Sequence, residues 1–453
     1  MSTTSTKPPS GTRDFLPEDV RRRDYVMRVV REVYESYGFE PIETPAYENI
    51  ETLLGKYGEE GNKLIFKILK RGEHEASGEA DLALRYDLTV PLARVVAQYQ
   101  SELPRFFKRY QIQPVWRADR PAKGRFREFY QCDIDAMGST SPVVEAELMG
   151  AVSEVLIRLG FNDFVIRLNH RKALSALLET AGVPEALQGD ALTAIDKLDK
   201  IGAEGVGAEL LTRGVSPAAT TACLDFFTGI TTEMPHADSA LQRLRTFVEK
   251  HHAGPSAVDE LETIVRLADG GPGHGRIRID PSLARGLSYY TGAIMEIAVP
   301  GLQGSMGGGG RYDTLVGMFL GRDVPAAGFS LGLERIILVM TERGMFPESV
   351  TRVPVDVMVT FLGDDLRSDA LRLASELRAE RLRVEVFPDG SRKLDKSLKY
   401  ASSRNVPMLV ILGEDERARG EVTVRDLQTR QQQAAPRATA ARDIARRIRI
   451  EAT

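Results

Sequence analysis

FFKRYQIQPVWRADRPAKGRFREFYQCDIDAM, residues Phe106 to Met137, is the stretch that decides the fold of this chain. Two hydrophobic, strand-like runs stand on either side of a loop that contains glycine, proline and basic residues. The cations of this region lie within eleven positions and are Arg117, Arg120, Lys123, Arg125 and Arg127. The second run also carries the carboxylates Asp133 and Asp135. The pattern predicts a strand–loop–strand hairpin that is cationic at one end and anionic at the other.

Such a hairpin has a specific chemical use. Planar guanidinium groups bind phosphate through two parallel hydrogen bonds, which a lysine point charge does not. Carboxylates at the far end suit an amine or an N–H donor. The sequence therefore indicates a ligand with phosphate at one end and a nitrogen donor at the other, although a run of charges alone is equally typical of an exposed, salt-bridged hairpin.

The segments before the hairpin and the long segment after it differ in pattern. Glu18–Tyr37 has apolar residues at helical spacing, and Phe39–Asn49, with two prolines, reads as extended chain. Residues 171–272 are rich in leucine, alanine and charged residues and predict a mostly helical insertion. Strand character returns at Arg276–Asp280, so the segments that flank the insertion are expected to share one sheet.

The last hundred residues form a separate pattern. Arg343–Val353 reads as a linker because Gly344 and Pro347 interrupt any periodicity. Strands and helices then alternate, which predicts a small α/β domain at 353–453. We therefore expect a divided domain with parts at 1–170 and 273–343, the insertion at 171–272, and this C-terminal domain.

Length and composition bound the class of protein. The chain has 453 residues, which suggests about three domains. Its 42% hydrophobic and 27% charged residues are ordinary for a globular protein, and the net charge of −4 does not exclude local nucleic-acid binding. Cys132 and Cys223 fit no metal or disulfide pattern, so a reduced, cytoplasmic location is expected. No signal-peptide or membrane-spanning pattern is found, and no membrane partner is expected.

Five ordered motifs resemble those of one enzyme family. Arg117, followed by Gly124–Phe129, is similar to motif 2 of class II aminoacyl-tRNA synthetases, and the continuation YQCDID resembles the histidyl-tRNA synthetase version. The other similar segments, in the family's order, are LRYDLTVPLAR at Leu84–Arg94, LARGLSYYT at Leu283–Thr291, GGGGRYD at Gly307–Asp313 and GLER at Gly332–Arg335. The resemblance implies an α+β fold, with a mostly antiparallel sheet, flanking helices, a helical insertion and a C-terminal α/β anticodon-binding domain.

The resemblance also implies an activity and partners. Enzymes of this family make histidyl-adenylate from ATP and L-histidine, with Mg²⁺ on the phosphates, and pass histidine to the terminal adenosine of tRNA(His). The insertion contacts the acceptor arm and the C-terminal domain the anticodon arm. The basic residues Arg392, Lys393, Lys396 and Lys399 fit RNA contact, although a solvated helix face is as compatible with their pattern. Helix 18–37 with Pro45 resembles motif 1, which implies a homodimer.

The resemblance assigns roles residue by residue. The predicted catalytic residues are Arg117, Arg285 and Arg335. The predicted ATP-binding residues are Arg117, Asp119, Arg125, Phe129 and Arg335. The predicted histidine-binding residues are Asp87, Thr89, Arg117, Gln131, Asp135, Arg285, Tyr289 and Tyr290. Fixed cations suit this chemistry because negative charge gathers around the α-phosphate as a carboxylate attacks it.

Several of these assignments carry open alternatives. Asp119 stands where the class usually has glutamate, and Asp87 and Thr89 could also cap a helix that starts at VPLARVV. The sequence has no GxxxxGK[ST] phosphate loop, and its six histidines form no spaced metal-ligand motif, so no resident metal is predicted. The glycines at 307–310 are expected to let the backbone approach bound histidine.

Two rival functions have a similar sequence pattern. One is the synthetase-like regulatory subunit of ATP phosphoribosyltransferase, which generally lacks the anticodon-binding domain and parts of the catalytic set. Here Arg117, Arg285 and Arg335 are present and the C-terminal domain is intact. The other rival is a different class II synthetase with a similar C-terminal domain, which LARGLSYYT and YQCDID disfavour.

Overall fold

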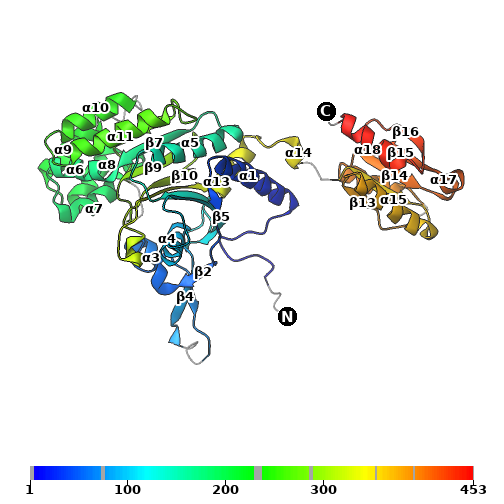
Figure 1. Cartoon of the computed structure of the whole chain (residues 1–453), viewed down its shortest axis with the longest axis horizontal. Coiled ribbons are helices and arrows are strands. Elements are labelled where there is room, and N and C mark those ends of the chain that lie inside the picture. The colour runs from blue at the N-terminus through cyan, green and yellow to red at the C-terminus, as the bar shows by residue number, and fades with distance from the viewer. Residues whose placement is uncertain are drawn as a thin grey trace. The chain divides into compact units, whose positions relative to one another are not determined.

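The computed structural model describes residues 5–72, 77–228, 237–284, 289–351, 355–390 and 393–451. The chain divides into two compact units, residues 1–345 and 346–453, which are considered separately below. Figure 1 shows the elements of each unit. None of the helices in these ranges is both long enough and apolar enough to cross a membrane.

An eight-stranded sheet organises the first unit, in the order β1-β5-β6-β11-β10-β9-β7-β8. Its strands are β1 (Glu40–Pro41), β5 (Phe107–Trp116), β6 (Glu128–Met137), β7 (Val165–His170), β8 (Ile277–Ile279), β9 (Ala293–Ala298), β10 (Gly307–Arg311) and β11 (Ala326–Gly332). The two edge strands pair in parallel and the six central strands are antiparallel. The predicted mostly antiparallel sheet is confirmed.

The hairpin predicted at Phe106–Met137 lies at the centre of this sheet. β5 and β6 pair over ten residues, from Phe107 opposite Met137 to Trp116 opposite Glu128. β6 then pairs with β11, which follows the insertion in sequence. The segments on both sides of the insertion therefore share one sheet, as expected.

Three helices cover the apolar face of the sheet. They are α1 (Pro17–Ser36), α5 (Val143–Arg158) and α13 (Leu333–Glu342), each in contact with β6. Apolar residues at helical spacing are buried along α1, and the Tyr34 hydroxyl donates to the Cys132 carbonyl oxygen over 3.1 Å. The two cysteines are free and buried. This layer leaves the other face of β6 for a polar site.

A small three-stranded sheet lies beside the hairpin, in the order β2-β4-β3. It is formed by β2 (Tyr47–Asn49), β3 (Lys67–Leu69) and β4 (Ala80–Leu84), with α2 (Ile50–Leu53), α3 (Gly58–Lys63), α4 (Thr89–Gln98) and α12 (Gly317–Leu320) nearby. Aromatic and aliphatic residues from these elements form one apolar cluster that includes Tyr57, Tyr86, Tyr289 and Tyr312.

Helices fill the predicted insertion. They are α6 (Arg171–Thr180), α7 (Glu185–Ile195), α8 (Leu198–Thr212), α9 (Pro217–Thr228), α10 (Ala237–Val248) and α11 (Gly254–Ala268). Figure 1 shows them as one green cluster next to β7. α6 begins directly where β7 ends, because the His170 side chain accepts a hydrogen bond from the Lys172 backbone nitrogen and caps the helix.

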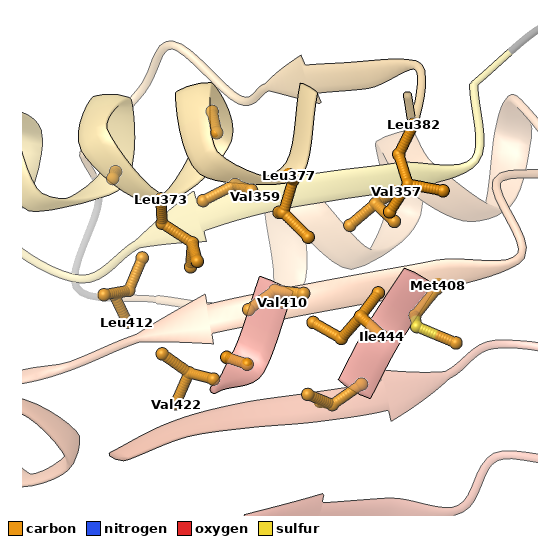
Figure 2. Packing of buried hydrophobic residues seen from close by; sticks show 14 of the residues in the cluster. Val357, Val359, Leu373, Leu377, Leu382, Met408, Val410, Leu412, Val422 and Ile444 are labelled. Atoms are coloured by element: carbon orange, nitrogen blue, oxygen red, sulfur yellow. The ribbon is translucent and has the colours of Figure 1, made fainter. Parts of the chain in front are cut away.

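The second unit is an α/β domain around a five-stranded sheet, in the order β13-β12-β14-β15-β16. Its elements are α14 (Glu348–Thr351), β12 (Val357–Phe361), the 3₁₀ helix η2 (Asp364–Leu366), α15 (Arg367–Ala379), β13 (Val384–Val386), α16 (Asp395–Ser403), β14 (Met408–Leu412), α17 (Glu414–Arg419), β15 (Glu421–Asp426), β16 (Gln432–Pro436) and α18 (Ala440–Glu451). Figure 2 shows Leu373 and Leu377 of α15 and Ile444 of α18 packed against Val359 and Val410. The predicted alternation is confirmed, but α17 and β16 were not predicted.

Candidate active site

One face of the large sheet is polar because side chains alternate along each strand. Gln131, Asp133 and Asp135 of β6 point to this face, opposite Gln113, Gln111 and Arg109 of β5. On the other side they face Gly332, Ser330 and Gly328 of β11. The three β6 side chains are buried, at 1% to 8% exposure. A buried polar row of this kind is costly without a ligand or internal partners.

Asp135 has internal partners on both oxygens. Arg109 Nη2 lies 2.8 Å from Asp135 Oδ2, and the Tyr312 hydroxyl donates to Oδ1. Burial raises the pKa of Asp135, while the Arg109 charge and the Tyr312 hydrogen bond lower it. A carboxylate offers about four lone-pair positions. Asp135 can therefore still accept a hydrogen bond from a ligand.

Gln131 and Asp133 carry acceptors without a donor. Gln131 Nε2 donates to the Ser330 hydroxyl over 2.8 Å. Among the described residues, nothing donates to Gln131 Oε1 or Asp133 Oδ1, which are both buried. Burial raises the pKa of Asp133 to about 7, and the neighbouring Asp135 carboxylate adds to this rise. These two acceptors form a place for a cationic or N–H-bearing group.

Asp87 holds the end wall of this polar face. Its side chain accepts from the Tyr57 hydroxyl over 3.0 Å, the Tyr289 hydroxyl over 3.2 Å and the Val90 backbone nitrogen over 3.1 Å. The last contact caps α4, so the predicted capping role is present, and Thr89 is the first residue of that helix. Burial raises the pKa of Asp87. Ligand contact by Asp87 and Thr89 remains a prediction.

Tyr289 and Tyr290 lie over the glycine strand β10. Their ring centroids are 5.1 Å apart at 73°, and a Cβ on Gly310 would lie 3.0 Å from Tyr290 Cδ1. A Cβ on Gly328 of the next strand would overlap Asp135 Oδ1. The glycine run forms a regular strand, and side-chain-free positions leave room for the tyrosine ring and the carboxylate.

Arg117 marks the cationic end. Its Nε donates to the Tyr86 carbonyl oxygen over 3.0 Å, and its guanidinium lies 4.3 Å from the Tyr86 ring centroid and 5.2 Å from that of Phe129. Within the described ranges no carboxylate forms an ion pair with Arg117. Two aromatic rings thus hold a guanidinium whose charge is left for a ligand.

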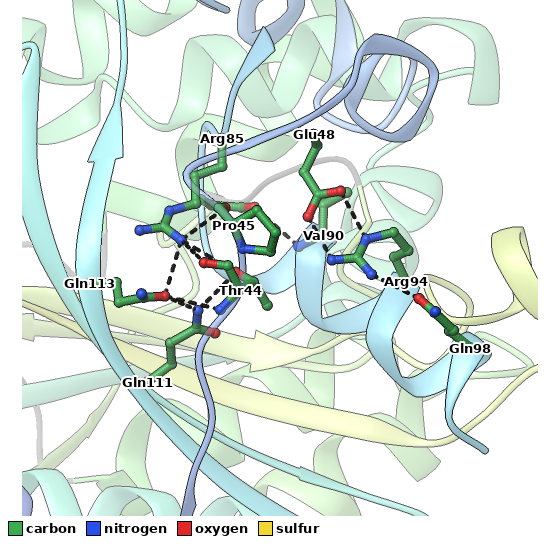
Figure 3. Close-up of polar contacts among 10 residues, drawn as sticks. Thr44, Pro45, Glu48, Arg85, Val90, Arg94, Gln98, Gln111 and Gln113 are labelled. Carbon is green, nitrogen blue, oxygen red and sulfur yellow. Dashed lines mark hydrogen bonds and ion pairs between the residues drawn. The ribbon is translucent and has the colours of Figure 1, made fainter. Parts of the chain in front are cut away.

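The backbone that carries Tyr86 is fixed from behind by a buried polar network, which Figure 3 shows. Arg85 donates to the Thr44 carbonyl oxygen over 2.7 Å, to Gln113 Oε1 over 3.0 Å and to the Pro114 carbonyl oxygen over 2.8 Å. Gln111 Nε2 joins the same network through Thr44. These bonds tie the extended segment before β2 to β5, so the Arg117 contact is preorganised.

The loop of the hairpin and the start of α13 complete the cationic end. Arg125 donates to Asp119 Oδ1 over 2.7 Å, so these two predicted phosphate-side residues contact each other. Arg335 donates to the Ser305 carbonyl oxygen. Its neighbour Glu334 points the other way, with one oxygen 2.8 Å from Arg23 Nη1 and the other accepting from the Tyr130 backbone nitrogen over 3.0 Å. This pair fixes the first turn of α13 and hence Arg335.

The structure therefore brings most predicted site residues to one face and its two ends. Arg285 lies outside the described residues, so its place stays a prediction. Sequence reasoning missed Arg109, Tyr312, Ser330 and Tyr57, which orient the predicted residues. Arg109, Gln111 and Gln113 alternate along β5, and that period of two was the signal that could have found the polar face.

Comparisons with known proteins agree with this geometry. Residues 11–336 match the family model "Histidyl-tRNA synthetase", and residues 356–447 match the model "Anticodon binding domain". A "Histidine--tRNA ligase" of Christiangramia forsetii is 43% identical over 90% of this chain and 92% of that protein. One of Gloeobacter violaceus is 42% identical over 97% of this chain and 98% of that protein.

Solved structures give the same neighbourhood. The histidyl-tRNA synthetase from Nostoc sp. PCC 7120 has a TM-score of 0.80 at 33% identity and covers 98% of this chain and 100% of its own. A Bacillus halodurans protein titled as an ATP phosphoribosyltransferase regulatory subunit/histidyl-tRNA synthetase has a TM-score of 0.73 at 21% identity, over 91% of this chain and 100% of its own. The latter likeness concerns the fold alone.

Proposed function

Because this chain belongs to the histidyl-tRNA synthetase family, we propose that the polar face of its large sheet activates histidine and presents it to tRNA. The protein is an aminoacyl-tRNA synthetase: a ligase that joins L-histidine to tRNA(His) at the expense of ATP. The regulatory-subunit alternative is less supported, since the curated relatives that align over nearly the whole chain are histidine–tRNA ligases.

The observation that carries the residue assignment is the buried row Gln131, Asp133 and Asp135 between Arg117 at one end and Asp87 at the other. We assign the α-ammonium of histidine to the end formed by Asp87, Thr89 and Gln131. The unpaired Gln131 Oε1 supports this assignment, because an ammonium group brings three donors. The imidazole N–H is assigned to Asp135 and its second nitrogen to Tyr290, with Tyr289 in the pocket wall.

At the cationic end we assign the α-phosphate to Arg117 and Arg285. Adenine is assigned to the space between Phe129 and Arg335, with Asp119 and Arg125 at the phosphates. A carboxylate oxygen of histidine then attacks the α-phosphorus, a P–O bond forms, and pyrophosphate leaves with the electrons of the broken bond. Positive groups fixed before the reaction stabilise this charge without reorganisation. In the second step a ribose hydroxyl of the terminal adenosine attacks the acyl carbon and AMP leaves.

Mg²⁺ is proposed to arrive on the phosphates of ATP, as part of the substrate. The acidic group nearest the phosphate-side arginines is Asp119, and one of its oxygens already accepts from Arg125. A metal held mainly by phosphate oxygens fits this donor set better than one held by a protein cage.

We further propose a cytoplasmic homodimer. α1 and the segment with Pro45 resemble the family's dimer element, and exposed apolar side chains of the neighbouring small sheet, Tyr47, Leu54 and Leu69, supply surface for an interface. The free, buried cysteines are compatible with a reducing compartment. The C-terminal domain is assigned to the anticodon arm of tRNA(His).

The test is ATP–pyrophosphate exchange measured with each amino acid in turn. Exchange should require histidine, because a pocket with buried polar groups rejects ligands that leave them unpaired. Exchange with another amino acid, or none with any, would overturn the proposal; the second result would favour the regulatory rival.

A further inference from the structure

An open cavity of about 320 Å³ lies beside the predicted histidine pocket. Its walls come from the first turns of α6, from the loop between α10 and α11, and from Tyr290 and Thr291. Tyr290 therefore stands between two spaces. None of the residues on the α6 side has a part in the mechanism above.

Arg171, the first residue of α6, is a cation without a partner. Its backbone nitrogen donates to the Gly292 carbonyl oxygen over 2.9 Å, which fixes the residue next to Tyr290 and Thr291. The side chain is half-buried, and this burial lowers its pKa. No hydrogen bond or ion pair of the Arg171 guanidinium is found in the described parts of the chain. Lys172 is exposed beside it. Two neighbouring cations at a cavity, one of them partly desolvated, fit an anionic ligand.

The opposite wall presents imidazole rings. Glu179 Oε2 accepts from His251 Nε2 over 2.7 Å, and the Ala253 backbone nitrogen donates to His251 Nδ1 over 3.2 Å. His252 is exposed, with its ring centroid 4.4 Å from that of His251. Its outer face is suited to stacking on a nucleobase.

A metal ion is the competing occupant of this wall. Glu179, His251 and His252 offer ligand atoms within 4.8 Å of one another. However, both ring nitrogens of His251 are already engaged, one by a backbone donor and one by the carboxylate. A metal-bound histidine normally donates its other N–H to an acceptor, so a metal would require a different orientation of the His251 ring. The observed contacts favour a nucleotide over a metal.

We propose that this cavity binds the single-stranded 3′ end of the tRNA, with a phosphodiester at Arg171 and Lys172 and a base against His252. The inference rests on the proposed function and refines it. The terminal ribose must reach the histidyl group, and Tyr290 borders both spaces, so the phosphates that precede the terminal adenosine must pass close to this pocket. Single-stranded nucleic acid is recognised by this combination of cations and ring faces.

The test uses the full-length protein and its preformed histidyl-adenylate. Single-turnover transfer to limiting tRNA(His) is measured for wild type, Arg171→Gln, Lys172→Gln and the matched control Arg266→Gln, an exposed arginine of α11 outside the cavity. Loss of a charged hydrogen bond should slow transfer about tenfold or more in Arg171→Gln. Lys172→Gln should show a smaller loss, and it keeps the test valid should Arg171→Gln fold poorly. Arg266→Gln should transfer at the wild-type rate.

A second arm identifies the phosphate. The tRNA is prepared with a neutral methylphosphonate at each of its last two linkages in turn. One neutral linkage should slow wild type but add little to the loss in Arg171→Gln, because both changes remove the same contact. Multiplying losses at both linkages, or wild-type transfer by both cavity variants, would overturn the proposal.

The remaining arms separate other occupants. If inorganic phosphate binds here instead of tRNA, millimolar phosphate will slow histidine-dependent exchange in wild type but not in Arg171→Gln, with transfer unaffected. Zn²⁺ binding by wild type that His252→Ala abolishes, again with normal transfer in Arg171→Gln, would assign the site to a metal. Histidine-dependent exchange by wild type is measured first, so a failure of the proposed function is recognised before the cavity is tested.

Discussion

Arg109 and Asp135 face each other across β5 and β6, with the guanidinium nitrogen 2.8 Å from the carboxylate oxygen and both side chains buried. The pair lies directly beneath the proposed imidazole position. Breaking one partner of a buried pair leaves an uncompensated charge and costs about 3–5 kcal/mol. Binding and stability are therefore coupled at this position.

Replacing Asp135 is expected to affect both properties. Asp135→Ala should lower the free energy of unfolding by about 3–5 kcal/mol, while Asp135→Asn, which keeps the shape and one acceptor, should lose less. Both should weaken histidine use far more than ATP use, because the imidazole donor is left unpaired. Urea denaturation and the KM values for the two substrates test this, with the exposed β4 residue Asp81→Ala as control. Equal losses for both substrates would contradict the assignment.

Asp133 is expected to make stability depend on pH. Its pKa is raised from 3.8 to about 7, chiefly by burial. Below about pH 4 the carboxyl is neutral in both states; from there to about pH 7 only the unfolded state loses the proton. This residue should therefore make the free energy of unfolding fall as pH rises across that window, by up to roughly 1.4 kcal/mol per pH unit. Denaturation of wild type and Asp133→Asn at several pH values measures the difference, which should vanish if Asp133 ionises normally.

Gly310 is expected to tolerate no side chain. A Cβ there would lie 2.6 Å from the Ala293 carbonyl oxygen and 3.0 Å from the Tyr290 ring. Gly310→Ala should destabilise the protein by about 1–3 kcal/mol and raise the KM for histidine by moving Tyr290. Gly189→Ala on α7, where a Cβ meets nothing within 4 Å, is the matched control and should be neutral or stabilising by about 1 kcal/mol. An unchanged histidine KM in Gly310→Ala would separate Tyr290 from the pocket.

Arg285 is expected to act in the chemical step. Its position in LARGLSYY, four residues before Tyr289, motivates this. Arg285→Ala should slow adenylate formation about a hundredfold or more while thermal unfolding stays close to that of wild type. Rapid-quench measurement of adenylate provides the test, and formation at the normal rate would remove Arg285 from the mechanism.

The second unit is expected to serve tRNA selection. A chain ending at Glu348 retains every assigned active-site residue and should still exchange pyrophosphate with histidine if it is folded and dimeric. It should aminoacylate tRNA poorly, because phosphate and base contacts to the anticodon arm are gone. Both activities are measured on the truncated protein after its mass in solution is checked. Full aminoacylation at limiting tRNA would assign the second unit another role.

The sequence predicted those features that local pattern and motif order control. The central hairpin, α1, the helices at 171–268 and most of the C-terminal alternation follow from periodicity. Local pattern failed where it was weak: β16 is a polar, mostly exposed strand, and α17 has six residues. β10 is a run of four glycines and an arginine, and only its pairing with β9 and β11 makes it a strand, since glycine has low strand propensity.

By itself, the sequence determined the strand-loop-strand hairpin, the helical insertion and the family motifs, because these depend on residues close together in the chain. Only the tertiary structure decided which distant side chains meet. Asp87 accepts from Tyr289, 202 residues later, and Arg171 shares a cavity wall with His252. Such contacts depend on strand order and on where the insertion folds back on the sheet, and neither leaves a periodic signal in the sequence. The burial that raises the pKa of Asp133 arises in the same way, from packing of the whole unit.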